Sequence, residues 1–343
     1  MRETDLWPAL REYWHPVAFS EEVGERPLGV RLLDERLVIC RIGGRLAAFR
    51  DLCVHRGTPL SLGWVEGETL VCAYHGWSYR ADGACVLIPS LPPEHPIPKR
   101  ACLTRYQAEE RYSLVWVCLS DEPRDPIPEF PEFDDPGYRV LCRQHQFWKA
   151  GAARMIENFV DQAHFPWVHE GILGDRAHTL TPDMHVRRDG EELLFWFDDI
   201  PTALRPVPHR RNYRLTRPYA LYTWIELPDG RTEAQIFVCT PHSAKESTRF
   251  YLIARNYDLE APEIVHGPII MKDKEIMATH KDIDPLTIKR IKVLDIVPEQ
   301  DRVIVENQRP EELPLDLSEE LHLKGPDAVA IEYRRMMKEL GVD

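Results

Sequence analysis

The sequence predicts an α+β protein with two domains, a mostly antiparallel β domain followed by a larger domain in which helices accompany antiparallel strands. Three observations lead to this prediction. Short apolar stretches and glycine turns fill the first part of the chain, a connection rich in proline and acid covers 121–137, and helix-like and strand-like segments mix after it. With the boundary placed in that connection, the domains are expected to span 1–136 and 137–343.

The first domain is expected to consist of hairpins from about residue 30 to residue 120, preceded by an N-terminal helix. Apolar stretches flank Gly43 and Gly44, a pair that is typical of a two-residue hairpin turn. A further strand, rich in aromatic and β-branched residues, is predicted over 112–119.

The second domain is expected to combine helices and strands. A helix opens it, two strands with alternating apolar residues follow, and two helices that each begin with a proline lie toward the C-terminus. The predicted segments are a helix over 153–164, strands over 232–239 and 248–257, and helices over 262–282 and 298–308.

The composition is that of a globular protein, with 43% hydrophobic and 29% charged residues. No apolar run approaches the roughly 18 residues of a membrane span, and the N-terminus has no apolar signal core. A formal charge of -13 argues against nucleic-acid binding, because a phosphate backbone needs a basic face. We therefore expect a cytoplasmic protein with no membrane or nucleic-acid partner, in which most cysteines are free thiols.

Two pairs of cysteine and histidine are the most informative feature of the chain. Cys53 and His55 form the first pair, and after sixteen intervening residues Cys72 and His75 form the second. Two thiolates and two imidazoles can hold a Rieske [2Fe-2S] cluster, with the cysteines on one iron and the histidines on the other. The same four ligands can hold a structural zinc ion. A glycine follows each pair closely, which suits loops whose backbone N–H groups approach the sulfides of a cluster.

A second constellation contains His164 and His169 on either side of Pro166. On one continuous helix these two imidazoles would face different sides. The proline disfavours a helical residue before it, so the helix is expected to end near His164 and let His169 turn back toward it. Two histidines with one distant carboxylate form the facial triad of mononuclear non-haem iron oxygenases, although most such histidine pairs bind no metal.

Together these constellations resemble the terminal oxygenase components of Rieske non-haem iron oxygenases, in particular the short single-subunit group exemplified by dicamba O-demethylase and vanillate O-demethylase. The resemblance extends over nearly the whole chain. It implies an antiparallel β Rieske [2Fe-2S] domain followed by an α+β helix-grip (START-like) catalytic domain with a large antiparallel sheet. It also implies a [2Fe-2S] cluster on the two Cys and His pairs, and an Fe(II) held by His164, His169 and a third ligand.

The resemblance places the third iron ligand in a helix near the C-terminus, where Asp301 is the best match. Gln300 stands where an acid commonly precedes the ligand, so Glu299 and Asp295 remain alternative ligands. If no metal binds there, Asp301 is expected to be a solvated acid in a first helical turn, where the helix dipole favours it.

Asn158, Asp161 and His164 follow one another at intervals of three, which predicts that they lie along one side of a helix. We take Asn158 and Asp161 as candidate catalytic residues. In the family that the chain resembles, the matching aspartate links the iron site to the cluster of a neighbouring subunit. Carried onto this chain, electrons would pass from His75 of one subunit through Asp161 of the next to His164, which implies a homotrimer. The alternative for Asp161 is an exposed helix acid.

The resemblance implies a terminal oxygenase that hydroxylates or oxidatively demethylates a small aromatic or heterocyclic substrate with O2. cis-Dihydroxylation remains the alternative within this class. Because the chain has no Gly-x-Gly-x-x-Gly fingerprint, a separate NAD(P)H-dependent reductase, with or without a ferredoxin, would supply the electrons. A Rieske electron carrier without oxygenase activity and a zinc-stabilised ligand-binding protein are the rival interpretations.

Overall fold

The computed structural model describes residues 1–343 except 25, 200–208, 261–263, 266–292 and 342–343. The chain divides into two compact units, a smaller one of Pro8–Ile127 and a larger one of Met1–Trp7 with Pro128–Asp343. The α+β class predicted from the sequence is confirmed, because strands in mostly antiparallel sheets dominate and helices accompany them in the larger unit. Among the described residues, no helix has the length and apolar character that crossing a bilayer requires.

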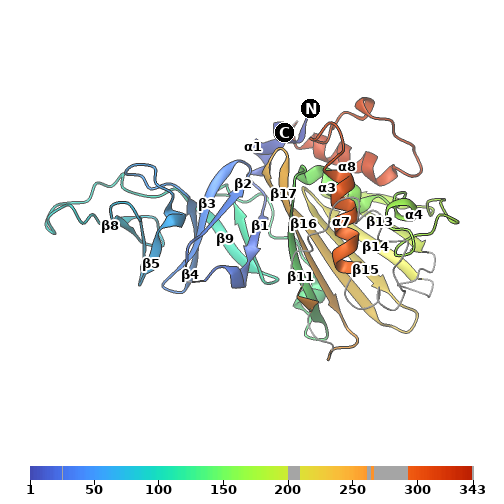
Figure 1. Ribbon diagram of the computed structural model, residues 1–343, viewed down its shortest axis with the longest axis horizontal. Helices are drawn as coiled ribbons and strands as arrows, with labels where there is room; N and C mark the ends of the chain where they lie inside the picture. The colour runs from blue at the N-terminus through green and yellow to red at the C-terminus, as the bar shows by residue number, and fades with distance from the viewer. Residues whose placement is uncertain (25, 200–208, 261–263, 266–292, 342–343) are drawn as a thin grey trace. The chain divides into compact units, whose positions relative to one another are not determined.

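The smaller unit contains a six-stranded sheet and a four-stranded sheet, both antiparallel (Figure 1). The first has the strand order β1-β10-β9-β4-β3-β2, and the second runs from β5 to β8 in chain order. The strands are β1 His15–Phe19, β2 Leu28–Leu32, β3 Glu35–Ile42, β4 Arg45–Arg50, β5 Trp64–Glu66, β6 Thr69–Val71, β7 Ser78–Tyr79, β8 Cys85–Leu87, β9 Arg105–Arg111 and β10 Leu114–Cys118, with 3-10 turns at Ser20–Glu22 and Leu60–Leu62.

Residues with positive φ form two hairpin turns of the smaller unit. The β3–β4 hairpin confirms the turn predicted at Gly43 and Gly44, which have φ of 56° and 75°. The strand predicted from residue 112 begins only at residue 114, because Tyr112 and Ser113 both adopt φ of 59°. Two consecutive residues with positive φ make the tight turn that joins β9 to β10.

The first residues of the chain belong with the larger unit. They include a 3-10 turn, Glu3–Leu6, and the first residue of a short helix α1, Trp7–Leu10, whose remaining residues belong to the smaller unit. Glu3 is buried, and its carboxylate accepts hydrogen bonds from the Tyr219 hydroxyl at 2.6 Å and the Ala153 backbone N–H at 3.2 Å. These bonds connect the first seven residues to the larger unit, whereas the sequence placed them in the first domain.

The larger unit is built on an eight-stranded sheet with the order β12-β13-β14-β15-β16-β17-β11-β18. All neighbours are antiparallel except β11 and β18, and the two strands predicted from alternation correspond to β16 and β17. The strands are β11 Arg139–Trp148, β12 His185–Asp189, β13 Glu192–Asp199, β14 His209–Thr216, β15 Ala220–Glu226, β16 Thr232–Ser243, β17 Glu246–Arg255 and β18 Ile264–Val265. The helices are α2 Pro131–Asp134, α3 Ala152–Val160, α4 Phe165–Val168, α7 Val293–Val305 and α8 Ala328–Glu339, with a 3-10 turn at Leu317–Glu319.

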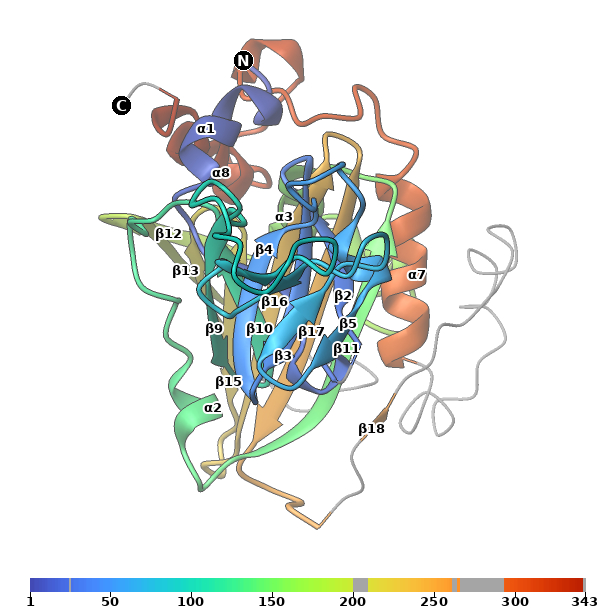
Figure 2. The same ribbon diagram turned by 90° about the vertical axis from the view of Figure 1, so that its left-hand side faces the viewer.

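Helices α3 and α7 cover one face of this sheet (Figures 1 and 2). Phe159 of α3 packs on Phe237 of β16, with ring centroids 5.4 Å apart. Gln146 of β11 donates a hydrogen bond to Glu299 of α7. The strand register puts Gln146 and Phe237 on the same face of the sheet, because side chains alternate along each strand. The two helices are therefore held beside each other over that face.

The C-terminal helices differ from the prediction. The helix predicted over 298–308 begins at Val293 and runs through Pro298, so the proline is internal. Pro298 removes one backbone hydrogen bond and its ring crowds the carbonyl four residues earlier, and we attribute the persistence of the helix to burial of side chains such as Ile296 and Val305. Of the helix predicted over 262–282, only Ile264–Val265 lie in the described part, and they form β18.

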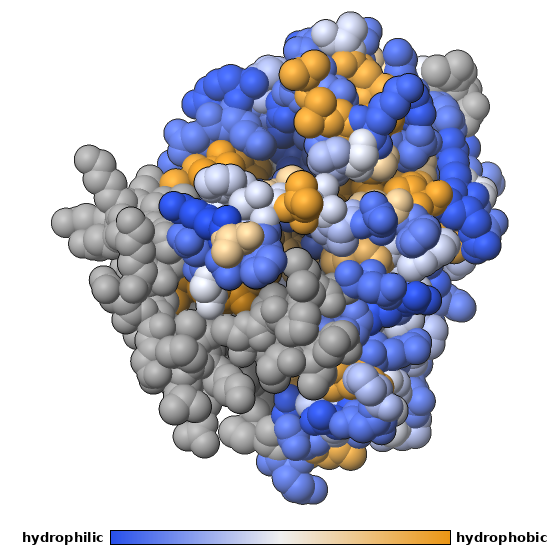
Figure 3. Space-filling view, turned by 90° about the vertical axis from the view of Figure 1, so that its right-hand side faces the viewer, coloured by the Kyte–Doolittle hydropathy of each residue, from blue (hydrophilic) through white to orange (hydrophobic). Residues whose placement is uncertain are grey.

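Hydrophilic side chains prevail over small apolar patches on the face of the larger unit shown in Figure 3. Large apolar side chains that are exposed in this unit include Trp167 and Leu180. Single exposed apolar residues are common on protein surfaces, so neither indicates a docking surface by itself.

Candidate functional site

Two loops of the smaller unit have the same backbone geometry. In each loop a glycine donates its N–H to the carbonyl of the cysteine four residues earlier, Gly57 to Cys53 at 2.9 Å and Gly76 to Cys72 at 3.0 Å. Both glycines have positive φ, +72° and +67°, which other residues rarely adopt. The equal turns let each loop present a cysteine and a histidine in the same way.

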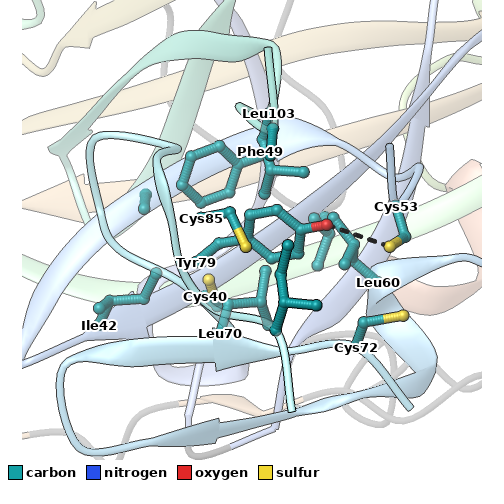
Figure 4. Close-up of a cluster of buried hydrophobic side chains, with 14 residues drawn as sticks. Cys40, Ile42, Phe49, Cys53, Leu60, Leu70, Cys72, Tyr79, Cys85 and Leu103 are labelled. Atoms are coloured by element: carbon teal, nitrogen blue, oxygen red, sulfur yellow. Dashed lines mark hydrogen bonds between the residues drawn. The ribbon is translucent and has the colours of Figure 1, made fainter. Parts of the chain in front are cut away.

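The four side chains of these loops fit the donor set of a Rieske cluster. Cys53 and Cys72 are buried at the edge of an apolar core (Figure 4), whereas His55 is half-buried and His75 is exposed. The two imidazole rings lie 4.6 Å apart between centroids. The Nδ1 atom of His55 is buried and has no hydrogen-bond partner among the described residues, as expected of an atom placed to bind a metal.

Two aromatic residues beside the loops contact these candidate ligands. The Tyr79 hydroxyl lies 3.1 Å from the Cys53 sulfur (Figure 4). Trp77 stacks on His55, with ring centroids 4.6 Å apart and planes inclined by 5°. No sequence pattern indicated a role for Tyr79, although its position four residues after His75 puts it on the strand that leaves the second loop. Burial, first of all, and the Cys53 thiol raise the pKa of Tyr79, so its hydroxyl stays a hydrogen-bond donor.

In the larger unit, His164, His169 and Asp301 bring three ligand atoms together. The Nε2 atoms of the two histidines are 3.2 Å apart, and the Asp301 Oδ1 atom lies 3.4 Å from His164 Nε2 and 3.0 Å from His169 Nε2. Ligands about 2.1 Å from a metal and at right angles to one another lie about 3 Å apart. The triangle therefore fits one face of a metal's coordination sphere.

Local structure explains how histidines five residues apart face each other. Helix α3 ends at Val160, earlier than the predicted end near His164, because Asp161 adopts an extended backbone with φ of -79° and ψ of 132°. The single helical turn α4 then lies between His164, the residue before it, and His169, the residue after it. The two imidazoles therefore bracket this turn, whereas one continuous helix would hold them on different sides.

In the protein without metal, the pKa values of His164 and Asp301 are shifted by their neighbours in the site. Burial alone would lower the pKa of His164, but hydrogen bonds to Asp161 and Asp301 outweigh burial and raise that pKa to about 9. For Asp301, burial raises the pKa, and His169 and His164 outweigh it and hold the pKa well below its ordinary range. The Asp301 carboxylate is thus held ionised beside the two histidines, which is the charge state that binding of a metal cation requires.

Asp161 and Asn158 both contact the triad. Asp161 Oδ2 lies 3.0 Å from His164 Nδ1, and its Oδ1 accepts a hydrogen bond from the Ala163 backbone at 2.8 Å. Asn158 donates to Asp301 Oδ1 at 3.5 Å. The prediction that Asn158, Asp161 and His164 share one side of a helix is wrong, because only Asn158 lies within α3. Their convergence comes from the bend after the helix.

The neighbours of Asp301 on α7 have separate roles. Asp301 is 6% exposed, so the solvated acid considered from the sequence is wrong. Glu299 forms an ion pair with Arg302 at 2.9 Å and accepts from Gln146, away from the histidines. The side chain of Asp295, the other alternative ligand, lies outside the described part of the structure. Gln300, which sequence analysis did not assign, faces His169 Nδ1 at 2.9 Å.

Comparison with known families agrees with this geometry. Residues 13–107 match the Rieske [2Fe-2S] domain family, and residues 148–343 match the vanillate O-demethylase oxygenase C-terminal domain family. The chain is a Rieske non-haem iron oxygenase. The family expected from the two sequence constellations is thereby confirmed, and the oxygenase accordingly uses a Rieske [2Fe-2S] cluster and a mononuclear Fe(II).

Relatives match this oxygenase over almost its whole length. Methylxanthine N1-demethylase NdmA of Pseudomonas putida is 30% identical over 96% of this chain and 89% of its own. Methylxanthine N3-demethylase NdmB of the same species is 31% identical over 97% of this chain and 90% of its own. The structure of Pseudomonas putida CBB5 NdmA with caffeine superposes with a TM-score of 0.81 at 31% identity, covering 98% of this chain and 93% of that one.

A more distantly related structure shares the fold of this chain. A crystal structure of dicamba monooxygenase bound to dicamba matches with a TM-score of 0.75 at 24% identity, over 97% of this chain and 98% of that one. Oxygenases of this family act on small substrates and take electrons from separate ferredoxin or reductase partners. The oxygenase is therefore one component of an electron-transfer system.

Proposed function

We propose that this oxygenase hydroxylates the carbon of an N-methyl or O-methyl group on a small aromatic or heterocyclic substrate, and that the product then loses formaldehyde. The observation that carries the proposal is the convergence of His164 Nε2, His169 Nε2 and Asp301 Oδ1 within 3.4 Å of one another. Three protein ligands on one face leave the other positions of an iron open for O2 beside the substrate.

The proposed cluster ligands are Cys53 and Cys72 on one iron and His55 and His75 on the other, and the proposed Fe(II) ligands are His164, His169 and Asp301. The cluster supplies single electrons, and the iron supplies the activation of O2. The chain itself holds the donor atoms, orients the substrate and excludes water. Asp161 supports this assignment, because it accepts the His164 Nδ1–H and so leaves Nε2 free for a metal.

Two kinds of support favour a flat substrate with a methyl group. The sheet face below α3 and α7 is aromatic, with Phe195 stacked on Tyr213 at 4.5 Å and Phe237 against Tyr251 at 4.5 Å. NdmA and NdmB are named as demethylases of methylxanthines, which carry N-methyl groups on a heterocycle. A toluene-4-sulfonate monooxygenase subunit of Comamonas testosteroni, 29% identical over 80% of this chain, makes hydroxylation of an aryl methyl group the second candidate.

The electron route is proposed to run between subunits of a homotrimer, from His75 of one subunit to Asp161 of the next and on to His164. The exposure of His75 supports this route, and so does the 33% exposure of the Asp161 side chain. An NAD(P)H-dependent reductase, with or without a ferredoxin, would reduce the cluster. We also propose a cytoplasmic location, where the free cysteines stay reduced.

A substrate screen tests the proposed function. Purified protein with a surrogate reductase is offered N-methyl heterocycles, aryl methyl ethers and methylarenes, while O2 uptake and formaldehyde are measured. One formaldehyde for each substrate-dependent O2 is the expected result for demethylation. An alcohol without formaldehyde would favour the second candidate, and a cis-diol would overturn monooxygenation.

A His164→Ala variant separates the oxygenase from an electron carrier. The variant is expected to keep the cluster's reduced EPR signal and to lose turnover. Unchanged turnover of every substrate in the variant would contradict the proposal, as would a wild-type protein that holds zinc instead of iron and acid-labile sulfide.

A further inference from the structure

We propose that Gln300 is a positioning residue that presents His169 to the iron through a neutral acceptor, so that the two histidines of the iron site are electronically unequal. This inference rests on the proposed function, in which His169 is an iron ligand. Gln300 touches neither substrate nor iron in this role and acts through the imidazole.

Helix α7 holds His169 by both ring nitrogens with two consecutive residues. Gln300 Oε1 lies 2.9 Å from His169 Nδ1, and Asp301 Oδ1 lies 3.0 Å from His169 Nε2. Consecutive helical residues point about 100° apart, so an imidazole seated between them meets one with each nitrogen. Gln300 and His169 are both 0% exposed, which leaves the ring little freedom to rotate.

Metal binding requires one orientation of the Gln300 amide. An imidazole that offers the Nε2 lone pair carries its proton on Nδ1, and that N–H needs an acceptor. Gln300 Oε1 is such an acceptor. A flipped amide would present its NH2 group to Nδ1 instead, which would force the proton onto Nε2 and block the lone pair.

The NH2 group of the Gln300 amide also supports a role for the amide oxygen. Gln300 Nε2 is buried and has no hydrogen-bond partner in the described part of the chain. An unsatisfied buried donor costs about 1–3 kcal/mol of folding free energy. The protein would therefore be more stable with an apolar side chain of the same size at this position, and a role of the amide oxygen explains why a glutamine is present. The bond to His169 is the use that the structure shows for that oxygen.

The partner of the second histidine is different. His164 Nδ1 faces the carboxylate of Asp161 at 3.0 Å. A carboxylate draws the Nδ1 proton and makes the imidazole a stronger donor to a metal, whereas an amide does so less. Asp161 and Asp301 already place two negative charges on the site. A third carboxylate at position 300 would be buried beside the Nδ1 atom of His169, and its charge would favour Fe(III) over Fe(II) through the imidazole.

Two substitutions distinguish the positioning effect of Gln300 from an effect of charge at this site. Both are tested on the full protein with its cluster. Gln300→Leu keeps the volume and removes the acceptor, and Gln300→Glu keeps an acceptor and adds charge. The dissociation constant for Fe(II) is measured by competition with a chelator, the iron midpoint potential by redox titration of the EPR signal, and the cluster EPR reports on folding. Gln162→Leu, which removes another buried amide two residues before His164 in the chain, is the matched control.

Gln300→Leu is expected to weaken Fe(II) binding about 10–100-fold with an unchanged cluster signal, since loss of a residue that supports a metal ligand has effects of that size. Gln300→Glu is expected to bind Fe(II) nearly as the wild type does and to lower the iron potential. Wild-type Fe(II) affinity in Gln300→Leu, equal potentials in Gln300→Glu and wild type, or an equal loss of affinity in Gln162→Leu would each overturn the inference. Failure of the proposed function has another signature, namely a His164→Ala variant that binds Fe(II) as tightly as the wild type.

Discussion

The Tyr79 hydroxyl and the Cys53 sulfur lie 3.1 Å apart in the core of the smaller unit. If Cys53 binds the cluster as a thiolate, the hydroxyl must be the donor. A hydrogen bond to a ligand sulfur withdraws electron density and stabilises the reduced cluster, so it raises the potential. The strand that follows the second loop thus contributes to redox tuning as well as to packing.

Tyr79→Phe is therefore expected to lower the potential of the cluster. A difference of about 1 kcal/mol between the two redox states corresponds to about 40 mV for one electron, which sets the expected size of the shift. A redox titration followed by EPR measures it. An unchanged midpoint in a protein with a full complement of iron and sulfide would show that this bond does not tune the cluster.

Asp301→Asn is expected to weaken Fe(II) binding by about 10-fold or more, because the amide has the shape of the carboxylate and lacks its charge. Glu299→Gln is the matched control on the same helix, since Glu299 pairs with Arg302 and not with the histidines. Iron is counted per chain after dialysis against a chelator. Equal iron loss in both variants would mean that Asp301 is not the third ligand.

Asp161→Asn is expected to reduce turnover about 10–100-fold while the cluster signal persists, because the His164 Nδ1–H loses a charged acceptor. Single-turnover kinetics after reduction of the cluster measure the electron step directly. Retention of the wild-type rate would leave Asp161 as an ordinary acid at the end of α3.

Mixed oligomers test the route between subunits. His75→Ala chains are expected to be inactive alone, and Asp161→Asn chains to show only the reduced turnover expected of that variant. The two kinds of chain are co-expressed with different tags, and mixed trimers are purified by both tags. In a mixed trimer, one interface places an intact cluster of one chain beside an intact Asp161 of the next, so part of the activity is expected to return. Absence of any recovery in such oligomers would place the electron route within one chain.

Glu3 predicts a dependence of stability on pH. Burial raises its pKa from 4.5 to about 7, against the lowering effect of hydrogen bonds from Tyr219 and Ala153. A raised folded-state pKa means that the folded protein binds this proton more tightly than the unfolded chain. The stability from this group is therefore complete below pH 4.5 and is lost as pH rises to about 7.

Glu3→Gln removes this titration. Relative to the wild type, the variant is expected to gain on the order of 3 kcal/mol of unfolding free energy between pH 4.5 and about 7, from the 1.36 kcal/mol of each pKa unit. Denaturant unfolding at a series of pH values measures it. Parallel curves for the two proteins would show that Glu3 does not titrate in this range.

Local sequence was enough to predict several parts of this oxygenase. The Cys and His pairs are visible because each loop places its two ligands within four residues, and the Gly43-Gly44 turn because glycine tolerates positive φ. The β16–β17 pair follows from two neighbouring segments rich in β-branched and aromatic residues. These features depend on contacts between residues close in the chain.

The partners of His169 could not be predicted in this way. His169 and Gln300 are 131 residues apart in the chain, and only the packing of α7 beside α3 over one sheet brings them together. Pro298, interpreted as a helix start, lies inside α7 because burial of that helix outweighs one lost hydrogen bond. The types of ligand could thus be predicted from the spacing of residues in the sequence. Their geometry and the residues that support them, Gln300 and Tyr79, depend on packing between distant parts of the chain, which no local pattern encodes.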